Sequence, residues 1–324
     1  MDESARLLLE LFKSSGRRPY EELAPAEARE QQRLGAIGSQ IDPPEVAAIE
    51  ERAAPSAFGP IPLRLYRGLG STSPAPAFIF IHGGGWALGS IATHDPLCRA
   101  LANAAACTVV SIEYRLAPEH RFPAAVEDSL AAADWIADQA TTLGIDPARI
   151  AIGGDSAGAN LAVVTALASH QTKPGRFAAQ VLLYPALDMR MGSASHRRFT
   201  ADLLLTHGTM LWFRELYLRD SSQQLDWRAS PCLSQHLELL PPTLMITAGY
   251  DPLCDEAYEF AAALRSRDIA VAHSHFDGQM HGFMTASKFI PEAQRAIAEI
   301  GEHLRQMLAL DRAPRPPYAP SRRR

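Results

Sequence analysis

Cysteine is scarce in this sequence, and long apolar runs are missing. The four cysteines, Cys98, Cys107, Cys232 and Cys254, show neither a CxxC pattern nor another spacing typical of metal sites. A chain of 324 residues does not depend on disulfides, so reduced thiols in a cytoplasm are expected. Every apolar run is far shorter than the roughly 20 residues that a membrane-spanning helix needs. The sequence therefore predicts a soluble, cytoplasmic protein without a membrane span.

Charge of one sign is not in excess either. The 31 Lys and Arg residues nearly balance the 36 Asp and Glu residues, which leaves a net charge of −5. The strongly basic face of a nucleic-acid-binding protein is therefore not expected, and nucleic acid is not a predicted partner. The N-terminus has no basic segment, and Glu10 interrupts its apolar residues, so no signal peptide is predicted.

Short apolar segments separated by helix-like stretches are the main pattern that is present. Such segments occupy residues 77–81, 108–112, 149–152, 180–184 and 243–246, and residues 61–65 alternate between apolar and polar. Nearly continuous apolar runs are typical of strands buried on both faces. Their alternation with helical patterns predicts an α/β fold with a mostly parallel sheet covered by helices on both sides. Functional residues are then expected at the carboxyl ends of the strands.

Two segments depart from this alternation. Residues 1–45 are charged and helix-compatible and end in a DPP sequence, so they are predicted to be an appendage. Residues 189–228 combine a polar loop with a helical pattern and are interpreted as an insertion over the sheet. The core would then comprise residues 46–188 and 229–310. The proline-rich residues 311–324 are predicted to be disordered.

Ser156 lies in the motif GDSAG, between an apolar segment and a helix-forming one. A serine at such a strand-to-helix turn adopts a strained backbone, and glycines two residues away on either side avoid clashes with the neighbouring backbone. The Ala157 amide would then point to where an oxyanion forms, at the positive end of a helix. The motif alone is not specific, because glycine and serine are common in turns.

A run of three glycines, residues 83–85, directly follows the apolar segment 77–81. Successive glycines cost backbone entropy on folding, so a geometric requirement such as close approach to a ligand must offset them. The amides of Gly84 and Gly85 are therefore candidates to bind, with Ala157, the oxygen of a tetrahedral intermediate. A plain flexible turn is the alternative, but this run and the GDSAG motif in the same chain favour an oxyanion site.

A serine nucleophile needs a base, and the base needs a carboxylate to hold its tautomer. Asp251 follows an apolar strand, and His281 lies in the loop after the last expected strand, residues 270–276. The chain order serine, acid, histidine is that of α/β-hydrolases. We therefore predict a catalytic triad of Ser156, His281 and Asp251. Asp255 is the main alternative for the acid.

Three other histidines are open to a second interpretation. His82 opens the glycine run and is expected to order that loop by hydrogen bonding rather than to act as a base. His273 and His275 form an HxH pair that could in principle bind zinc. Because no third ligand motif lies nearby, we interpret them as strand residues. No metal and no cofactor are predicted.

Taken together, these motifs resemble the hormone-sensitive-lipase-like family of bacterial esterases, in the branch with a GDSAG motif. The matching segments are HGGGW at 82–86, EYRLAPE at 113–119, GDSAGAN at 154–160, DPL at 251–253, DE at 255–256 and HGF at 281–283. The resemblance covers residues 60 to 310 and implies an α/β-hydrolase fold with a helical cap formed by residues 1–45 and 189–228. It also implies cofactor-free hydrolysis of short- to medium-chain acyl esters. Cys254 departs from the family, in which a basic residue often occupies this position.

The cap is expected to determine specificity. Side chains that could line an apolar pocket beneath it are Trp86, Leu204, Leu205, Met210 and Phe213. Packing in the interior of the cap is the alternative for each of them. Such a pocket would favour short acyl chains, so the predicted partner is a small ester. A homodimer is a further expectation.

Two other functions stay open. One is a non-catalytic small-molecule binding protein on the same fold, since the plant gibberellin receptors resemble this family. Those receptors lack the catalytic histidine, whereas His281 is present here. The other is a peptidase, but no propeller-like repeat that could gate peptides is found ahead of the hydrolase segments.

Overall fold

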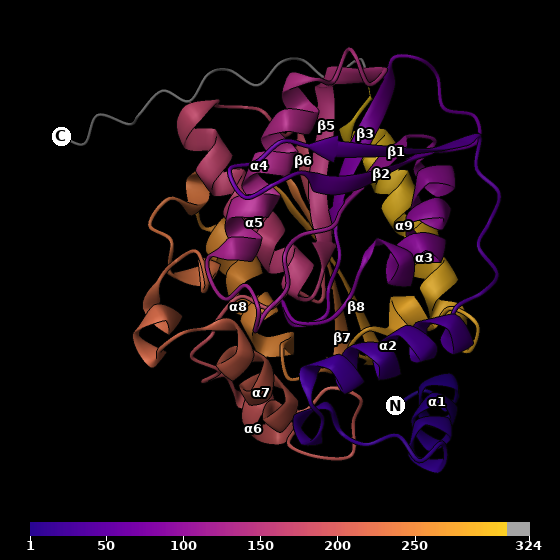
Figure 1. Ribbon diagram of the computed structural model, residues 1–324, viewed down its shortest axis with the longest axis vertical. Coiled ribbons are helices and arrows are strands. Elements are labelled where there is room, and N and C mark those ends of the chain that lie inside the picture. Colours follow the sequence, from indigo (N-terminus) through magenta and orange to yellow (C-terminus); the bar gives the residue numbers. More distant parts are fainter. Residues whose placement is uncertain (310–324) are drawn as a thin grey trace.

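The computed structural model describes residues 1–309, and its centre is one eight-stranded sheet (Figure 1). The strands are β1 (Ala48–Ala54), β2 (Ile61–Arg67), β3 (Ala75–Ile81), β4 (Thr108–Ile112), β5 (Ile145–Asp155), β6 (Ala179–Leu183), β7 (Thr243–Tyr250) and β8 (Val271–Met280). Their spatial order is β1-β2-β4-β3-β5-β6-β7-β8. β2 is antiparallel to β1 and β4, and all other pairs are parallel. The predicted mostly parallel sheet is thus confirmed.

Helices cover both faces of the sheet. Those described are α1 (Glu3–Ser14), α2 (Pro25–Ser39), α3 (Ile91–Ala105), α4 (Ala124–Asp138), α5 (Ala157–Thr172), α6 (Ala194–Arg198), α7 (His207–Tyr217), α8 (Cys254–Arg265) and α9 (Pro291–Met307). Short 3-10 helices are η1 (Tyr20–Glu22), η2 (Ser221–Leu225), η3 (Pro231–Leu233), η4 (Leu237–Leu239) and η5 (Phe283–Ala286). Apolar side chains of α3 and α9 form one core, and those of α4, α5 and α8 form the other.

The side chains of β3 explain why its sequence is apolar throughout. Phe78 and Phe80 belong to the core beneath α3 and α9, whereas Ile79 and Ile81 belong to the core beneath α4, α5 and α8. All four are fully buried. Successive side chains of a strand point to opposite faces, so a strand covered on both faces has no position for a polar residue.

The edge strand β1 was not predicted from the sequence. It contains Glu50, Glu51 and Arg52, and Ala54 is its only buried residue. β1 is held in the sheet by backbone pairing with β2 over its whole length and by a 2.6 Å ion pair between Glu51 and Arg64 of β2. Because the strand is stabilised by pairing rather than by burial, it carries no hydrophobic pattern that could reveal it.

The helices α1, α2, α6 and α7 gather at one end of the molecule (Figure 1). They belong to the segments 1–45 and 189–228 that were expected to form a cap. The Tyr20 ring of η1 lies 6.4 Å from Trp212 and 6.3 Å from Phe213 of α7, and Lys13 pairs with Asp202 at 2.7 Å. The two segments therefore contact each other. Their boundaries stay predictions, and residues 311–324 lie outside the described part of the chain.

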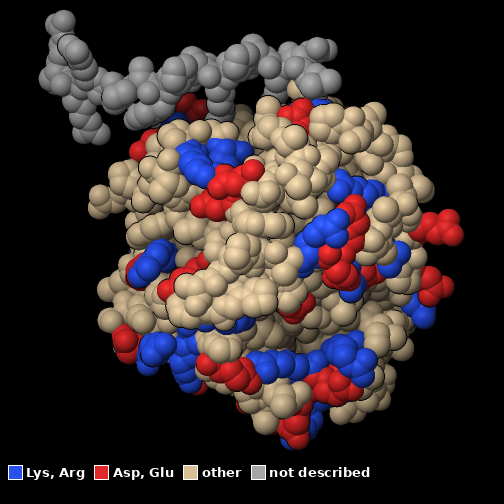
Figure 2. Space-filling view, turned by 45° about the horizontal axis from the view of Figure 1, so that its top comes forward, with Lys and Arg blue, Asp and Glu red and all other residues tan. Residues whose placement is uncertain are grey.

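The surface carries both signs of charge. On the face drawn in Figure 2, Lys and Arg side chains are interspersed with Asp and Glu rather than gathered into a patch of one sign. Among the helices described, none has the length and apolar character that a bilayer crossing requires.

Candidate active site

Ser156 occupies a tight turn between β5 and α5. Its backbone has φ 55° and ψ −117°, a conformation that costs a residue other than glycine about 1–3 kcal/mol. The Ser156 amide donates to Leu183 O at 2.8 Å, and its carbonyl oxygen accepts from Asn160 N at 3.2 Å. These bonds to β6 and α5 hold the strained turn, which presents the serine at the carboxyl end of β5.

The two glycines of the GDSAG motif allow backbone to pack directly on backbone. A Cβ added at Gly154 would lie 2.1 Å from Ile81 O, and one at Gly158 would lie 1.9 Å from the same oxygen. Both distances are far inside van der Waals contact, so any side chain here would separate α5 from the end of β3. The spacing of the motif therefore follows from this contact as well as from the turn.

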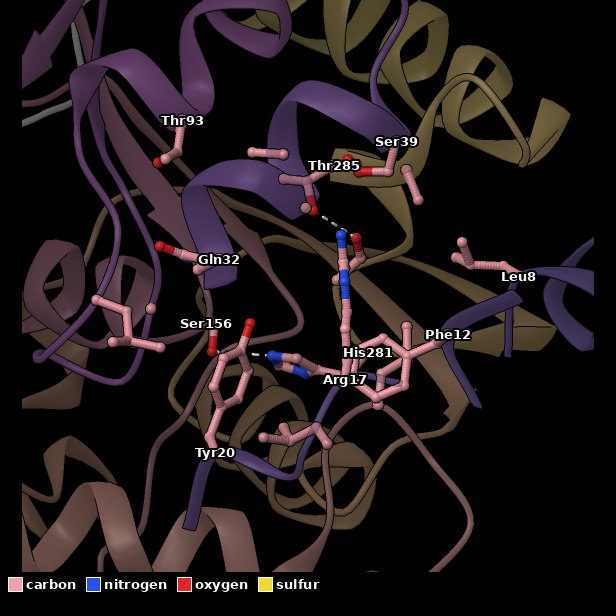
Figure 3. A pocket seen from close by; sticks show the side chains of 18 of the residues that line it. Leu8, Phe12, Arg17, Tyr20, Gln32, Ser39, Thr93, Ser156, His281 and Thr285 are labelled. Atoms are coloured by element: carbon pink, nitrogen blue, oxygen red, sulfur yellow. Dashed lines mark hydrogen bonds between the residues drawn. The ribbon is translucent and has the colours of Figure 1, made fainter. Parts of the chain in front are cut away.

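The predicted serine, histidine and acid lie side by side. Ser156 Oγ donates to His281 Nε2 at 2.9 Å (Figure 3). His281 Nδ1 in turn donates to Asp251 Oδ2 at 2.8 Å. Asp251 follows β7 and is 1% exposed, and its second oxygen accepts from Leu253 N at 2.8 Å. The carboxylate is thus fixed from both sides, and the imidazole is oriented with Nε2 toward the serine.

Asp255, the alternative acid, faces another part of the molecule. It lies in the first turn of α8, and its Oδ2 accepts from Ser195 N at 2.7 Å. This bond ties α8 to the start of α6. The neighbouring Cys254 is buried, which raises the pKa of its thiol to about 12. The departure from the family pattern therefore leaves a neutral group next to Asp251.

The glycine run forms a loop in which the amides of Gly84 and Gly85 are available to bind a ligand. Gly84 has φ +115° and Gly85 has φ +58°, conformations that suit glycine. A Cβ at Gly85 would lie 2.1 Å from the Phe213 ring, so α7 packs directly on this loop. Within residues 1–309, neither the Gly84 nor the Gly85 amide donates to a protein acceptor. Ala157 is the first residue of α5, where helical amides lack intrahelical partners.

A buried polar cluster supports the loop from behind. Asp155 accepts from Gly83 N at 2.7 Å and faces His94 Nε2 at 3.2 Å. Burial by itself raises the pKa of Asp155, but the attraction of His94 and the Gly83 bond outweigh it and lower the pKa. His82 donates from Nδ1 to Gly83 O at 2.9 Å and stacks on Tyr114. Because burial lowers the pKa of His82 to about 3, this residue is neutral and orders the loop.

A cavity of about 460 Å³ opens above Ser156 and His281. Of the five predicted pocket residues, Leu204, Leu205 and Phe213 line it. Trp86 and Met210 are not among the described lining residues. The Trp86 ring is 1% exposed and stacks on Tyr217 at 4.7 Å, and Met210 is buried in α7. Trp86 and Met210 therefore pack in the protein interior, which was the alternative given for each predicted pocket residue.

Much of the cavity wall comes from the N-terminal segment, which contributed no residue to the predicted site. The lining residues from this segment include Leu8, Leu11, Phe12, Arg17, Tyr20 and Gln32. Burial raises the pKa of Tyr20 to about 12, so its hydroxyl stays protonated. In the sequence, Leu8, Leu11 and Phe12 are spaced to share one face of a helix, but this pattern does not reveal what that face covers.

The HxH pair lies elsewhere, on β8. His273 Nε2 and His275 Nδ1 each contact Thr247 Oγ1 at 2.8 Å, and His275 Nε2 pairs with Asp277 at 2.9 Å. Across the described residues, no group of three or more His, Cys, Asp or Glu side chains is placed to hold a metal ion.

Comparison with known proteins is consistent with this geometry. A family described as having the alpha/beta hydrolase fold matches residues 78–285. Carboxylic ester hydrolase LipN of Mycobacterium tuberculosis is 43% identical over 73% of this chain and 64% of its own length. Ethyl acetate hydrolase of Pseudomonas putida is 36% identical over 93% of this chain and 96% of its own.

A solved structure extends the likeness to three dimensions. The hyperthermophilic esterase from the archaeon Pyrobaculum calidifontis superposes with a TM-score of 0.89 and 36% identity, covering 95% of this chain and 98% of that one. The family match over residues 78–285 includes both the glycine loop and the serine turn, and the Pseudomonas putida and Pyrobaculum calidifontis enzymes align with 93% and 95% of this chain. The chain therefore belongs to the α/β-hydrolase family, in its hormone-sensitive-lipase-like group.

Proposed function

We propose that this chain is a serine carboxylesterase that hydrolyses short- to medium-chain acyl esters, with Ser156 as nucleophile, His281 as general base and Asp251 as its orienting acid. The observation that supports this most directly is the continuous hydrogen-bonded path from Ser156 Oγ through His281 to Asp251, at 2.9 and 2.8 Å, beside a 460 Å³ cavity. The named ester hydrolases among the relatives support the same reaction.

Acylation begins when Ser156 Oγ attacks the ester carbonyl carbon while His281 Nε2 takes the hydroxyl proton. The carbonyl oxygen becomes an oxyanion, which the amides of Gly84, Gly85 and Ala157 bind. Such donors stabilise charge that develops only in the transition state. When the tetrahedral intermediate collapses, the bond to the alcohol oxygen breaks, and the alcohol leaves with the proton from His281. An acyl-enzyme on Ser156 remains.

Deacylation repeats these steps with water. His281 Nε2 takes a proton from a water molecule, whose oxygen attacks the acyl carbon, and the same amides bind the new oxyanion. Collapse returns the proton to Ser156 Oγ and releases the carboxylic acid. The buried Asp251 carboxylate stabilises the imidazolium in both halves of the reaction.

The test of this proposal is the Ser156→Ala variant with p-nitrophenyl butyrate. Hydrolysis should fall to background while the thermal unfolding temperature stays close to that of the wild type. A fluorophosphonate should label the wild type at Ser156 and leave the variant unlabelled, which also separates a catalyst from a binding protein on the same fold. Wild-type-like hydrolysis by the variant would refute the assignment.

We also propose a cytoplasmic location, on the grounds of the cysteine pattern in the sequence, and a homodimer. The dimer is tested by size-exclusion chromatography with light scattering, which should give twice the mass of one chain. A mass of one chain across a tenfold concentration range would count against it.

A further inference from the structure

Arg17 brings a positive charge into the catalytic cavity. It lies in the loop between α1 and η1, is partly buried and lines the same cavity as Ser156 and His281. Figure 3 shows its side chain extending along the cavity with the guanidinium directed toward Thr285. A charged group at this position is surrounded by residues that are otherwise mostly apolar or neutral.

The Arg17 guanidinium has packing partners but no anion. It lies 5.7 Å from the centre of the Phe12 ring, and a Cβ added at Gly35 of α2 would be 2.7 Å from its Nη1. Within the described chain, Arg17 makes no hydrogen bond and no ion pair with a protein group. The adjacent Arg18, by contrast, pairs with Glu27 at 3.4 Å on the surface.

No carboxylate of the cavity wall is available to neutralise Arg17. Asp155 is the only Asp or Glu among the lining residues of the described chain, and its oxygens face Gly83 N and His94. A guanidinium presents five N–H donors in a planar fork that matches a carboxylate. An arginine that is held in a ligand cavity without a protein partner is therefore suited to a carboxylate that the ligand brings.

We propose that Arg17 binds a carboxylate carried by the ester substrate, so that the enzyme prefers carboxylated esters to neutral ones of similar length. Tyr20, on the same wall, offers a hydroxyl as a second donor. This inference rests on the proposed esterase function and names a substrate class for it. The carboxylate belongs either to the acyl part or to the alcohol part of the ester, and the two are separable by experiment.

The experiment measures kcat/KM by pH-stat titration for two matched pairs of esters. Monoethyl glutarate against ethyl valerate places the carboxylate on the acyl side, and butyryloxyacetate against ethyl butyrate places it on the alcohol side. The wild type should prefer the carboxylated ester in one pair. In Arg17→Met, the ratio of the two kcat/KM values in that pair should fall about 10- to 100-fold, the usual weight of a hydrogen bond to a charged group. Arg17→Lys should retain part of the preference.

Arg18→Met is the matched control, since it removes a neighbouring arginine that does not line the cavity, and its ratio should equal that of the wild type. Gly35→Ala is a second variant, because the added methyl group displaces the end of the Arg17 side chain while leaving its charge in place. It should lower the ratio in the same direction as Arg17→Met. It also keeps the test decisive if Arg17→Met does not fold.

The outcomes separate this inference from the function on which it rests. Ser156-dependent hydrolysis of ethyl butyrate and ethyl valerate, with equal ratios in the wild type, Arg17→Met and Gly35→Ala for both pairs, would overturn the role of Arg17 and leave the esterase assignment intact. Hydrolysis of none of the four esters, or hydrolysis that persists in Ser156→Ala, would instead refute the proposed function.

Discussion

Replacing Asp251 with asparagine removes the negative charge that faces His281 and keeps the size of the side chain. In the wild type, the His281 imidazolium that forms during catalysis is held 2.8 Å from an Asp251 oxygen that is almost fully buried. Two unit charges whose centres are about 4 Å apart attract by about 4 kcal/mol at an effective dielectric constant near 20. Since about 1.4 kcal/mol corresponds to tenfold in rate, kcat should fall about 1000-fold.

The assay is steady-state hydrolysis of p-nitrophenyl butyrate by Asp251→Asn and by a matched variant, Asp255→Asn. Asp255 bonds to Ser195 N and makes no contact with His281 among the described residues, so its variant should keep wild-type kcat. Circular dichroism and thermal unfolding would verify that both variants are folded. The loss in Asp251→Asn should appear in kcat, because the charge stabilises the transition state rather than the bound ester.

A fall of less than about tenfold in Asp251→Asn would refute this reasoning, because the worked attraction predicts about two orders of magnitude more. The reverse pattern, an inactive Asp255→Asn and an active Asp251→Asn, would show that Asp255 is the acid. Partial unfolding of either variant would appear in the thermal melt and is therefore distinguishable from a catalytic effect.

Packing at the serine turn predicts that Gly158→Ala lowers the free energy of unfolding by about 1–3 kcal/mol, because its Cβ would lie 1.9 Å from Ile81 O. Urea titration would measure this, and Gly192→Ala, whose Cβ meets no atom within 4 Å, should change it by at most about 0.5 kcal/mol. The next prediction concerns the buried pair of His94 and Asp155. Burial by itself lowers the pKa of His94, but the attraction of the Asp155 carboxylate is stronger, so the pKa of His94 is raised. The charged pair therefore adds full stability below the unfolded pKa of about 6.5 and loses it as pH rises through the folded pKa. The free energy of unfolding of the wild type should therefore exceed that of His94→Gln most at low pH, and the difference should shrink as pH rises from about 6.5 through the folded pKa. A difference that does not change with pH in urea titrations would contradict this prediction. Across p-nitrophenyl esters of rising acyl length, kcat/KM should be highest for short to medium chains, because the cavity holds about 460 Å³; preference for long, emulsified chains would contradict it.

The sequence by itself determined the central strands of the sheet and the order of the candidate catalytic residues. Strands buried on both faces must be apolar along their whole length, so β3 to β7 can be recognised in the sequence as short apolar runs. The GDSAG motif is recognisable in the sequence because both glycines lie within two residues of Ser156, although the Ile81 oxygen that they allow to approach belongs to β3. The chain order of Ser156, Asp251 and His281 then follows from where the strands end.

Only the tertiary structure decided which groups meet. Asp251 and Asp255 differ by one helical turn in sequence, and their separation into one that faces His281 and one that faces Ser195 depends on how α8 packs on the core. The cavity wall is drawn from α1, α2 and the segment before α7, far from Ser156 in the chain, and Trp86 and Met210 pack away from it. Arg17 is one of many arginines in the sequence. That Arg17 has no anionic partner within the described chain can be recognised only from the folded structure, because ion pairing depends on distance in space and not on position in the sequence.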